Sequence, residues 1–110
     1  MMPKGFLGEF EQMVLLAILQ QGDTAFGLEV RREIERSADR SVSRSAFYTT
    51  LDRLERKGLL EWSDGEPEDS NRKAPVRLFR VTEAGKEALL RSRRALWTLW
   101  RGLDEIVEKR

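Results

Sequence analysis

The sequence predicts a mainly helical α+β domain, in which three helices precede a two-stranded hairpin and a long helix ends the chain. Three segments with helical periodicity are separated by short breaks before residue 59. Two short apolar runs rich in β-branched and aromatic residues then flank a polar stretch, which is typical of paired strands. With 110 residues, the chain has room for one compact domain with a modest core.

The first helix is expected from Leu7 to Gln21, where Gly22 provides a C-terminal cap. Its centre, from Met13 to Leu19, is apolar on every side instead of along one stripe. Because a small domain can hardly cover such a helix alone, this pattern predicts a partner molecule. The apolar run is far shorter than the roughly 20 residues that span a bilayer, and no signal peptide precedes it. We therefore expect a cytoplasmic protein without membrane association.

The second helix is expected from Phe26 to Ala38 and the third from Ser43 to Gly58. The third helix has an apolar stripe headed by Phe47, and its opposite face is polar. Strands are expected at residues 59–62 and 76–81, with the turn-forming residues 64–75 as the loop between them.

The last helix is expected from Thr82 to the C-terminus, a length of roughly 42 Å. Within it, two sets of residues recur every seven positions and form a seam of a and d positions. These sets are Leu89, Leu96 and Leu103, and Ser92, Leu99 and Ile106. A seam of this length needs another surface to pack against. Gly102 interrupts the helical pattern and predicts a bend.

The composition excludes several classes of functional site. The chain has no cysteine and no histidine, so disulfides, thiolate zinc sites and Ser-His-Asp triads are ruled out. Its carboxylates are dispersed along helix faces, and no glycine-rich phosphate loop follows a strand. We therefore expect no enzyme, no cofactor and no metal. The net charge of +1 identifies no class of partner by itself.

Three helices and then a hairpin with a polar tip are the element order of a winged helix-turn-helix. We expect a winged helix-turn-helix DNA-binding domain in residues 1–82 and a dimerisation helix in residues 83–110, with the third helix as the recognition helix and residues 64–75 as the wing. Residues 40–60 contain five basic and two acidic side chains, whereas residues 7–38 contain three basic and six acidic ones. The near-neutral total thus conceals a basic region where a DNA-binding face is expected. The predicted DNA-binding residues are Ser43, Arg44, Ser45, Tyr48, Thr49, Arg53, Arg56, Arg72, Lys73 and Arg77.

The residues alone leave alternatives open. The charge pattern of the third helix also fits a solvated amphipathic helix, and Asp52 would repel phosphates. In the wing, Glu66, Glu68 and Asp69 oppose contact with DNA. A winged-helix domain that acts as a protein–protein adaptor is therefore the competing hypothesis.

Four segments of the chain resemble the PadR-like transcriptional regulators, in that family's order and spacing. They are Leu7–Leu19, Phe26–Val30, Ser43–Leu59 and Phe79–Gly85. The resemblance implies a winged-helix DNA-binding domain that dimerises through its first and last helices and usually represses transcription; a single C-terminal helix corresponds to the short subfamily. It also implies that Tyr48 and its neighbours meet DNA while basic residues of the wing track the backbone. The sequence departs from the family in its wing. Members of the family often have a more basic tip, and they often have a Tyr-Tyr pair at the positions of Leu78 and Phe79.

A homodimer is predicted from two features, the first helix that is apolar all round and the seam of the last helix. The expected interface residues are Phe10, Met13, Val14, Leu89, Leu96, Leu99, Leu103 and Ile106. A two-fold dimer would place its recognition helices about 34–36 Å apart, which predicts a palindromic operator in double-stranded DNA. The alternative is that the seam packs only on the chain's own core.

Trp97 and Trp100 lie one turn apart beside the seam. In some members of the family that the chain resembles, aromatic residues of this helix sandwich flat hydrophobic or cationic compounds across the dimer. A small hydrophobic or planar effector bound by these two tryptophans is therefore a hypothesis. The alternative is that both indoles fill the interface as packing residues.

Overall fold

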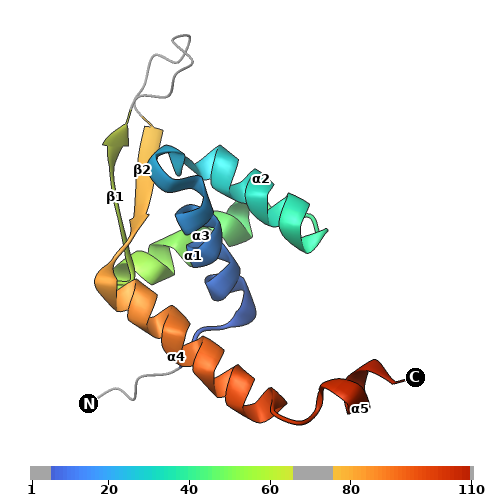
Figure 1. The fold of residues 1–110 in the computed structure, drawn as a ribbon. Coiled ribbons are helices and arrows are strands. Elements are labelled where there is room, and N and C mark those ends of the chain that lie inside the picture. The colour runs from blue at the N-terminus through green and yellow to red at the C-terminus, as the bar shows by residue number, and fades with distance from the viewer. Residues whose placement is uncertain (1–5, 66–75, 110) are drawn as a thin grey trace.

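The computed structural model describes residues 6–65 and 76–109. It confirms the predicted order of helices and strands (Figure 1). The elements are α1 (Glu9–Gln21), η1 (Gly22–Thr24), α2 (Gly27–Ala38), α3 (Arg44–Arg56), β1 (Leu60–Gly65), β2 (Val76–Val81), α4 (Glu83–Trp100) and α5 (Asp104–Glu108). The fold is thus mostly helical with one two-stranded antiparallel sheet, as a winged helix-turn-helix requires.

The core lies where α1, α2, α3 and the hairpin meet. Each helix turns its apolar stripe inward, and the largest fully buried side chain is Phe47 of α3. The other core residues of these elements include Val14, Leu15, Ile18, Val30, Ile34, Leu51, Leu54, Leu60, Phe79 and Val81. Because α3 is anchored along one whole side, its opposite side is held facing outward.

The hairpin pairs in register from Leu60 opposite Val81 to Gly65 opposite Val76. Its second strand is also tied to the chain just before α2. The amide of Phe79 donates a hydrogen bond to the carbonyl of Ala25 at 2.9 Å, and Phe26 forms an isolated antiparallel bridge with Leu78. The base of the wing is therefore fixed against the start of α2, a connection that the sequence pattern did not predict.

Local capping explains where α3 and α4 begin. The Ser43 hydroxyl accepts a hydrogen bond from the amide of Ala46 at 3.1 Å, and the Thr82 hydroxyl accepts one from Gly85 at 3.1 Å. Thr82 also donates to the carbonyl of Gly58 at 2.7 Å, so the start of α4 is bound to the end of α3. At Gly85, a Cβ atom would lie 2.2 Å from the carbonyl oxygen of Leu59, so only glycine permits this close approach.

The expectation of one helix from Thr82 to the C-terminus is wrong. Helix α4 ends at Trp100, and the short helix α5 follows in a different direction (Figure 1). The backbone leaves the helix at Arg101, which has a ψ of 122°, and Gly102 follows with a left-handed φ of 79°. The seven-residue seam is therefore interrupted before Leu103 and Ile106, and these residues do not continue the helix that carries Leu96 and Leu99.

Two seam or interface residues also prove to be internal. Val14 was predicted to contact a partner, but its side chain is fully buried in the chain's own core. Ser92 is buried as well, and its hydroxyl accepts a hydrogen bond from the amide of Leu7 at 3.1 Å, which fixes the segment before α1 onto α4. None of the helices that the structure describes is long and apolar enough to cross a membrane.

Candidate nucleic-acid interface

The outward face of α3 is polar and exposed along its whole length. It lies opposite the buried side chains of Phe47, Leu51 and Leu54, so its orientation is determined by the core. Five of its residues are exposed, namely Ser45, Thr49, Asp52, Arg53 and Arg56. Hydroxyl and guanidinium groups in this arrangement can donate hydrogen bonds to phosphates and to base edges.

The first turn of α3 combines a cap with an aromatic platform. Ser43 is exposed, but its hydroxyl is used as the N-cap acceptor. The half-buried ring of Tyr48 meets the ring of Phe47 edge-on, with centroids 5.3 Å apart and an interplanar angle of 78°. The guanidinium of Arg44 lies over the Tyr48 ring, 5.7 Å from its centroid. Tyr48 is therefore anchored by the core on one side and covered by a cation on the other.

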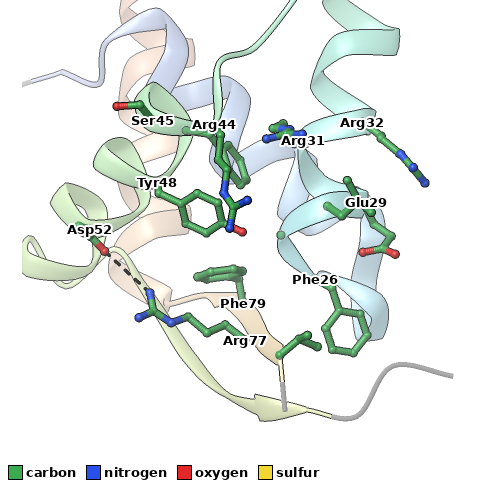
Figure 2. A pocket seen from close by; sticks show the side chains of 14 residues that line it. Phe26, Glu29, Arg31, Arg32, Arg44, Ser45, Tyr48, Asp52, Arg77 and Phe79 are labelled. Carbon is green, nitrogen blue, oxygen red and sulfur yellow. Dashed lines mark ion pairs between the residues drawn. The ribbon is translucent and has the colours of Figure 1, made fainter. Parts of the chain in front are cut away.

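Arg77 of β2, at the base of the wing, connects the wing to α3 through Asp52. Its guanidinium lies 4.5 Å from the centroid of the Trp62 ring. It also lies 4.0 Å from the Asp52 carboxylate, an ion pair drawn in Figure 2. Both members of this ion pair are about half exposed, so the pair contributes little to stability. Its effect is local, because it places a positive charge beside the Asp52 carboxylate that would otherwise repel DNA. The other predicted wing contacts, Arg72 and Lys73, lie outside the described residues.

The structure adds two basic residues to this region that the sequence analysis did not single out. Arg31 and Arg32 of α2 line a cleft of about 1190 Å³ between α2, α3 and the wing, together with Arg44, Tyr48 and Arg77 (Figure 2). In the sequence, the Arg31-Arg32 pair sits among glutamates and has the pattern of a solvated helix face. Only the packing of α2 beside the hairpin shows that these arginines face the same cleft as α3.

The C-terminal end of α3 is held by an ion pair with α1. Lys57 Nζ lies 2.9 Å from Glu11 Oε2, and the other carboxylate oxygen of Glu11 accepts a hydrogen bond from the amide of Gly8 at 2.9 Å. Burial disfavours the charged carboxylate, but these hydrogen bonds and the nearby cations outweigh it and lower the pKa of Glu11. Glu11 therefore fixes the position of α3 relative to α1.

A second surface is apolar and lies on α4 and the adjacent side of α1. Trp97 is 69% exposed and Leu99 is 72% exposed, and Leu16, Leu96 and Trp100 are exposed beside them. Part of this surface forms a groove of about 340 Å³ lined by Leu16, Leu96 and both tryptophans. The remaining predicted interface residues differ in exposure. Phe10, Met13 and Leu89 are half-buried against the core, whereas Leu103 and Ile106 are exposed beyond the end of α4.

With this geometry established, comparison with known proteins identifies the family. The profile described as the transcriptional regulator PadR-like family matches residues 15–91, which is more than half of the chain. The chain belongs to the PadR-like family of transcriptional regulators. Comparison with curated protein sequences finds no significant match.

Several solved structures share the fold, including one of a PadR-like transcriptional regulator. The chain resembles a PadR-like transcriptional regulator from Bacillus cereus with a TM-score of 0.74 and 17% sequence identity, over 92% of this chain and 93% of that one. It resembles a transcriptional regulator from Clostridium thermocellum with a TM-score of 0.68 and 19% identity, over 89% and 92% of the two chains. It also resembles RosR of H. salinarum, with a TM-score of 0.66 and 23% identity over 87% and 79%.

Proposed function

We propose that this PadR-like protein is a sequence-specific DNA-binding repressor that acts as a homodimer. The exposed polar face of α3 carries the proposal, because a core of fully buried side chains holds this face outward beside the wing. In this arrangement α3 enters the major groove, and Thr49 and Arg56 at the centre of the face contact base edges. Ser45, Tyr48, Arg44 and Arg53 surround them, and the wing follows the backbone or the minor groove.

The apolar surface of α1 and α4 supports the homodimer. A contiguous group of exposed leucines and tryptophans is costly to leave in water, and surfaces of this kind mark interaction sites. A two-fold axis through this surface would present two copies of α3 to one side of a duplex, so the operator would be an inverted repeat. Occupancy of such an operator would block transcription.

A small planar compound that enters the groove beside Trp97 and Trp100 would act as the effector.

The experiment that tests DNA binding compares the wild type with a Thr49→Ala/Arg56→Ala variant. Both residues are exposed, so the variant should keep its fold. Affinity is measured by fluorescence anisotropy at about 50 and 200 mM salt, for a duplex that the wild type selects from a random pool and for a mixed-sequence duplex. Base contacts contribute only on the selected duplex, and phosphate contacts make binding strongly salt-dependent. We expect tight, salt-sensitive binding by the wild type and weaker binding by the variant. The matched control is Arg101→Gln, which removes an exposed arginine at the far end of α4.

Salt-insensitive or absent binding by a folded wild-type protein would contradict the proposal. In that case the protein would be a winged-helix adaptor, and its partner would be another protein.

A further inference from the structure

The cleft between the first turn of α2, the start of α3 and the base of the wing is lined by an excess of positive charge. Four arginines, from α2, α3 and β2, and two carboxylates line it. These residues are Arg31, Arg32, Arg44 and Arg77, and Glu29 and Asp52. Figure 2 shows that the Arg32 side chain extends away from Tyr48 and Arg44. The carboxylate of Asp52 is paired with Arg77 at 4.0 Å, which leaves the other three arginines as the main cations of the cleft.

Tyr48 and Gly27 form the floor of this cleft in an unusually close approach. The hydroxyl oxygen of Tyr48 lies only 2.7 Å from the position that a Cβ atom on residue 27 would occupy. Any side chain at this position would displace the hydroxyl, so glycine is what allows Tyr48 to sit against the first turn of α2. The φ of Gly27 is not in the left-handed region, so its role is to provide space and not to permit a special backbone conformation.

The backbone amides in the first turn of α2 donate no hydrogen bond to a capping side chain. The N-cap residue is Phe26, whose apolar side chain makes no capping hydrogen bond with the first-turn amides. Close by on the same helix, Nε of Arg31 is buried without a hydrogen-bond partner among the described residues. Because no solvent reaches this atom, any contact of Arg31 with a ligand in the cleft is made by its other guanidinium nitrogens.

We propose that this cleft binds one phosphate of the DNA backbone. The Tyr48 hydroxyl, the guanidinium groups of Arg31 and Arg44, and the first-turn amides of α2 would donate hydrogen bonds to the phosphate oxygens. The cleft adjoins the exposed face of α3, so one duplex can reach both. The proposal rests on the proposed DNA-binding function, and it gives Gly27 a positioning role that acts through Tyr48.

A double-mutant cycle on Gly27 and Tyr48 tests this site. The variants are Tyr48→Phe, Gly27→Ala and the combination, and the probe is a mixed-sequence duplex at about 50 mM salt, because a phosphate contact does not depend on sequence. Loss of a hydrogen bond to a charged group predicts about tenfold weaker binding for Tyr48→Phe. Gly27→Ala should weaken binding to a similar extent because it displaces the same hydroxyl. When it is added to Tyr48→Phe, Gly27→Ala should cause little further loss, because the next Tyr48 atoms lie at 3.5 and 3.8 Å, which is ordinary contact distance.

A third variant tests the charge of the site. Arg31→Gln should reduce the slope of log affinity against log salt concentration by about 1 for each subunit bound. Arg101→Gln, which removes a distant exposed arginine, should leave the slope unchanged. Thermal unfolding of each variant shows whether the fold is retained.

The results separate this site from DNA binding as a whole. A wild type that binds DNA while Tyr48→Phe binds equally well would overturn the phosphate site alone. If the affinity loss of the double variant equals the product of the losses in Gly27→Ala and Tyr48→Phe, the positioning role of Gly27 is overturned. If the folded wild type binds no duplex, the proposed function fails and the phosphate site with it.

Discussion

Lys57, at the end of α3, donates a hydrogen bond of 2.9 Å to Glu11 in the first turn of α1, although the two residues lie 46 positions apart. Glu11 is buried, and it also caps its own helix by accepting from the amide of Gly8. The Glu11 carboxylate therefore caps the start of α1 and also holds the end of α3 beside α1. The exposed face of α3 depends on this contact for its position.

Replacement of Glu11 should destabilise the fold. Glu11→Ala leaves the amide of Gly8 and the ammonium group of Lys57 without their partner, and we expect the free energy of unfolding to fall by about 2 kcal/mol. Urea denaturation measures this change. Glu105→Ala, an exposed carboxylate of α5, is the control and should have almost no effect. Equal stability of the Glu11→Ala variant and the wild type would show that the contact is not maintained in solution.

The contribution of Glu11 should depend on pH. Hydrogen bonds and nearby cations lower the pKa of Glu11 in the folded chain, despite its burial. Its stabilising effect is therefore fully present above the ordinary carboxyl pKa and is lost as the pH falls through the lower, folded-state value. Denaturation of the wild type and of Glu11→Gln between about pH 7 and pH 3 should show the stability difference shrinking as the pH falls. A difference that stays constant over this range would argue against the lowered pKa.

Gly85 should tolerate no side chain. In Gly85→Ala the new Cβ atom would lie 2.2 Å from the backbone oxygen of Leu59 and 2.7 Å from a methyl group of Val81. Since a backbone atom cannot move aside easily, we expect a loss of about 3 kcal/mol, measured by thermal unfolding. Gly8→Ala is the matched control, because there the nearest atom is the Glu11 carboxylate oxygen at an ordinary 3.6 Å.

Charges on the apolar surface of α4 should dissociate the proposed dimer. Leu96→Asp/Leu99→Asp would bury unpaired carboxylates at the interface and should weaken self-association by at least about 100-fold, as measured by sedimentation. Both leucines are exposed within the single chain, so its core should be unaffected. Thr98→Asp introduces a charge elsewhere on α4 and should leave the dimer intact. Unchanged association of the double variant would place the interface on another surface.

A planar cationic dye should quench tryptophan fluorescence if the groove beside Trp97 and Trp100 binds an effector. Trp62, in β1, provides a signal that should remain. The quenching should disappear in a Trp97→Leu/Trp100→Leu variant that stays folded. Failure of the dye to quench the wild type would show that the two indoles serve only in packing.

The sequence predicted helix α3 well because its signals are local. Ser43 is a strong cap, and the period from Phe47 to Leu54 leaves one side polar, so both the start and the orientation of α3 followed from the residues. For α1 the same reasoning failed. A helix that is apolar all round does not reveal which side faces its own core, and Val14 was assigned to the interface although it is fully buried.

Other features depend on contacts between distant segments or on backbone conformation. The seven-residue pattern continues through Leu103 and Ile106, so the sequence favoured one helix, whereas the backbone turns away from the helix at Arg101 and Gly102. The cleft beside α2 could not be predicted, because it arises from the pairing of Phe26 with Leu78. That pairing brings the wing alongside α2 and its arginines.

The most direct test of DNA recognition by α3 is selection of binding sites from a random pool of duplexes by the wild-type protein. We predict enrichment of an inverted repeat whose half-site centres lie about one helical turn apart, and loss of that enrichment in Thr49→Ala/Arg56→Ala. Failure of a folded wild-type protein to enrich any sequence, or identical enrichment by the variant, would contradict recognition through α3.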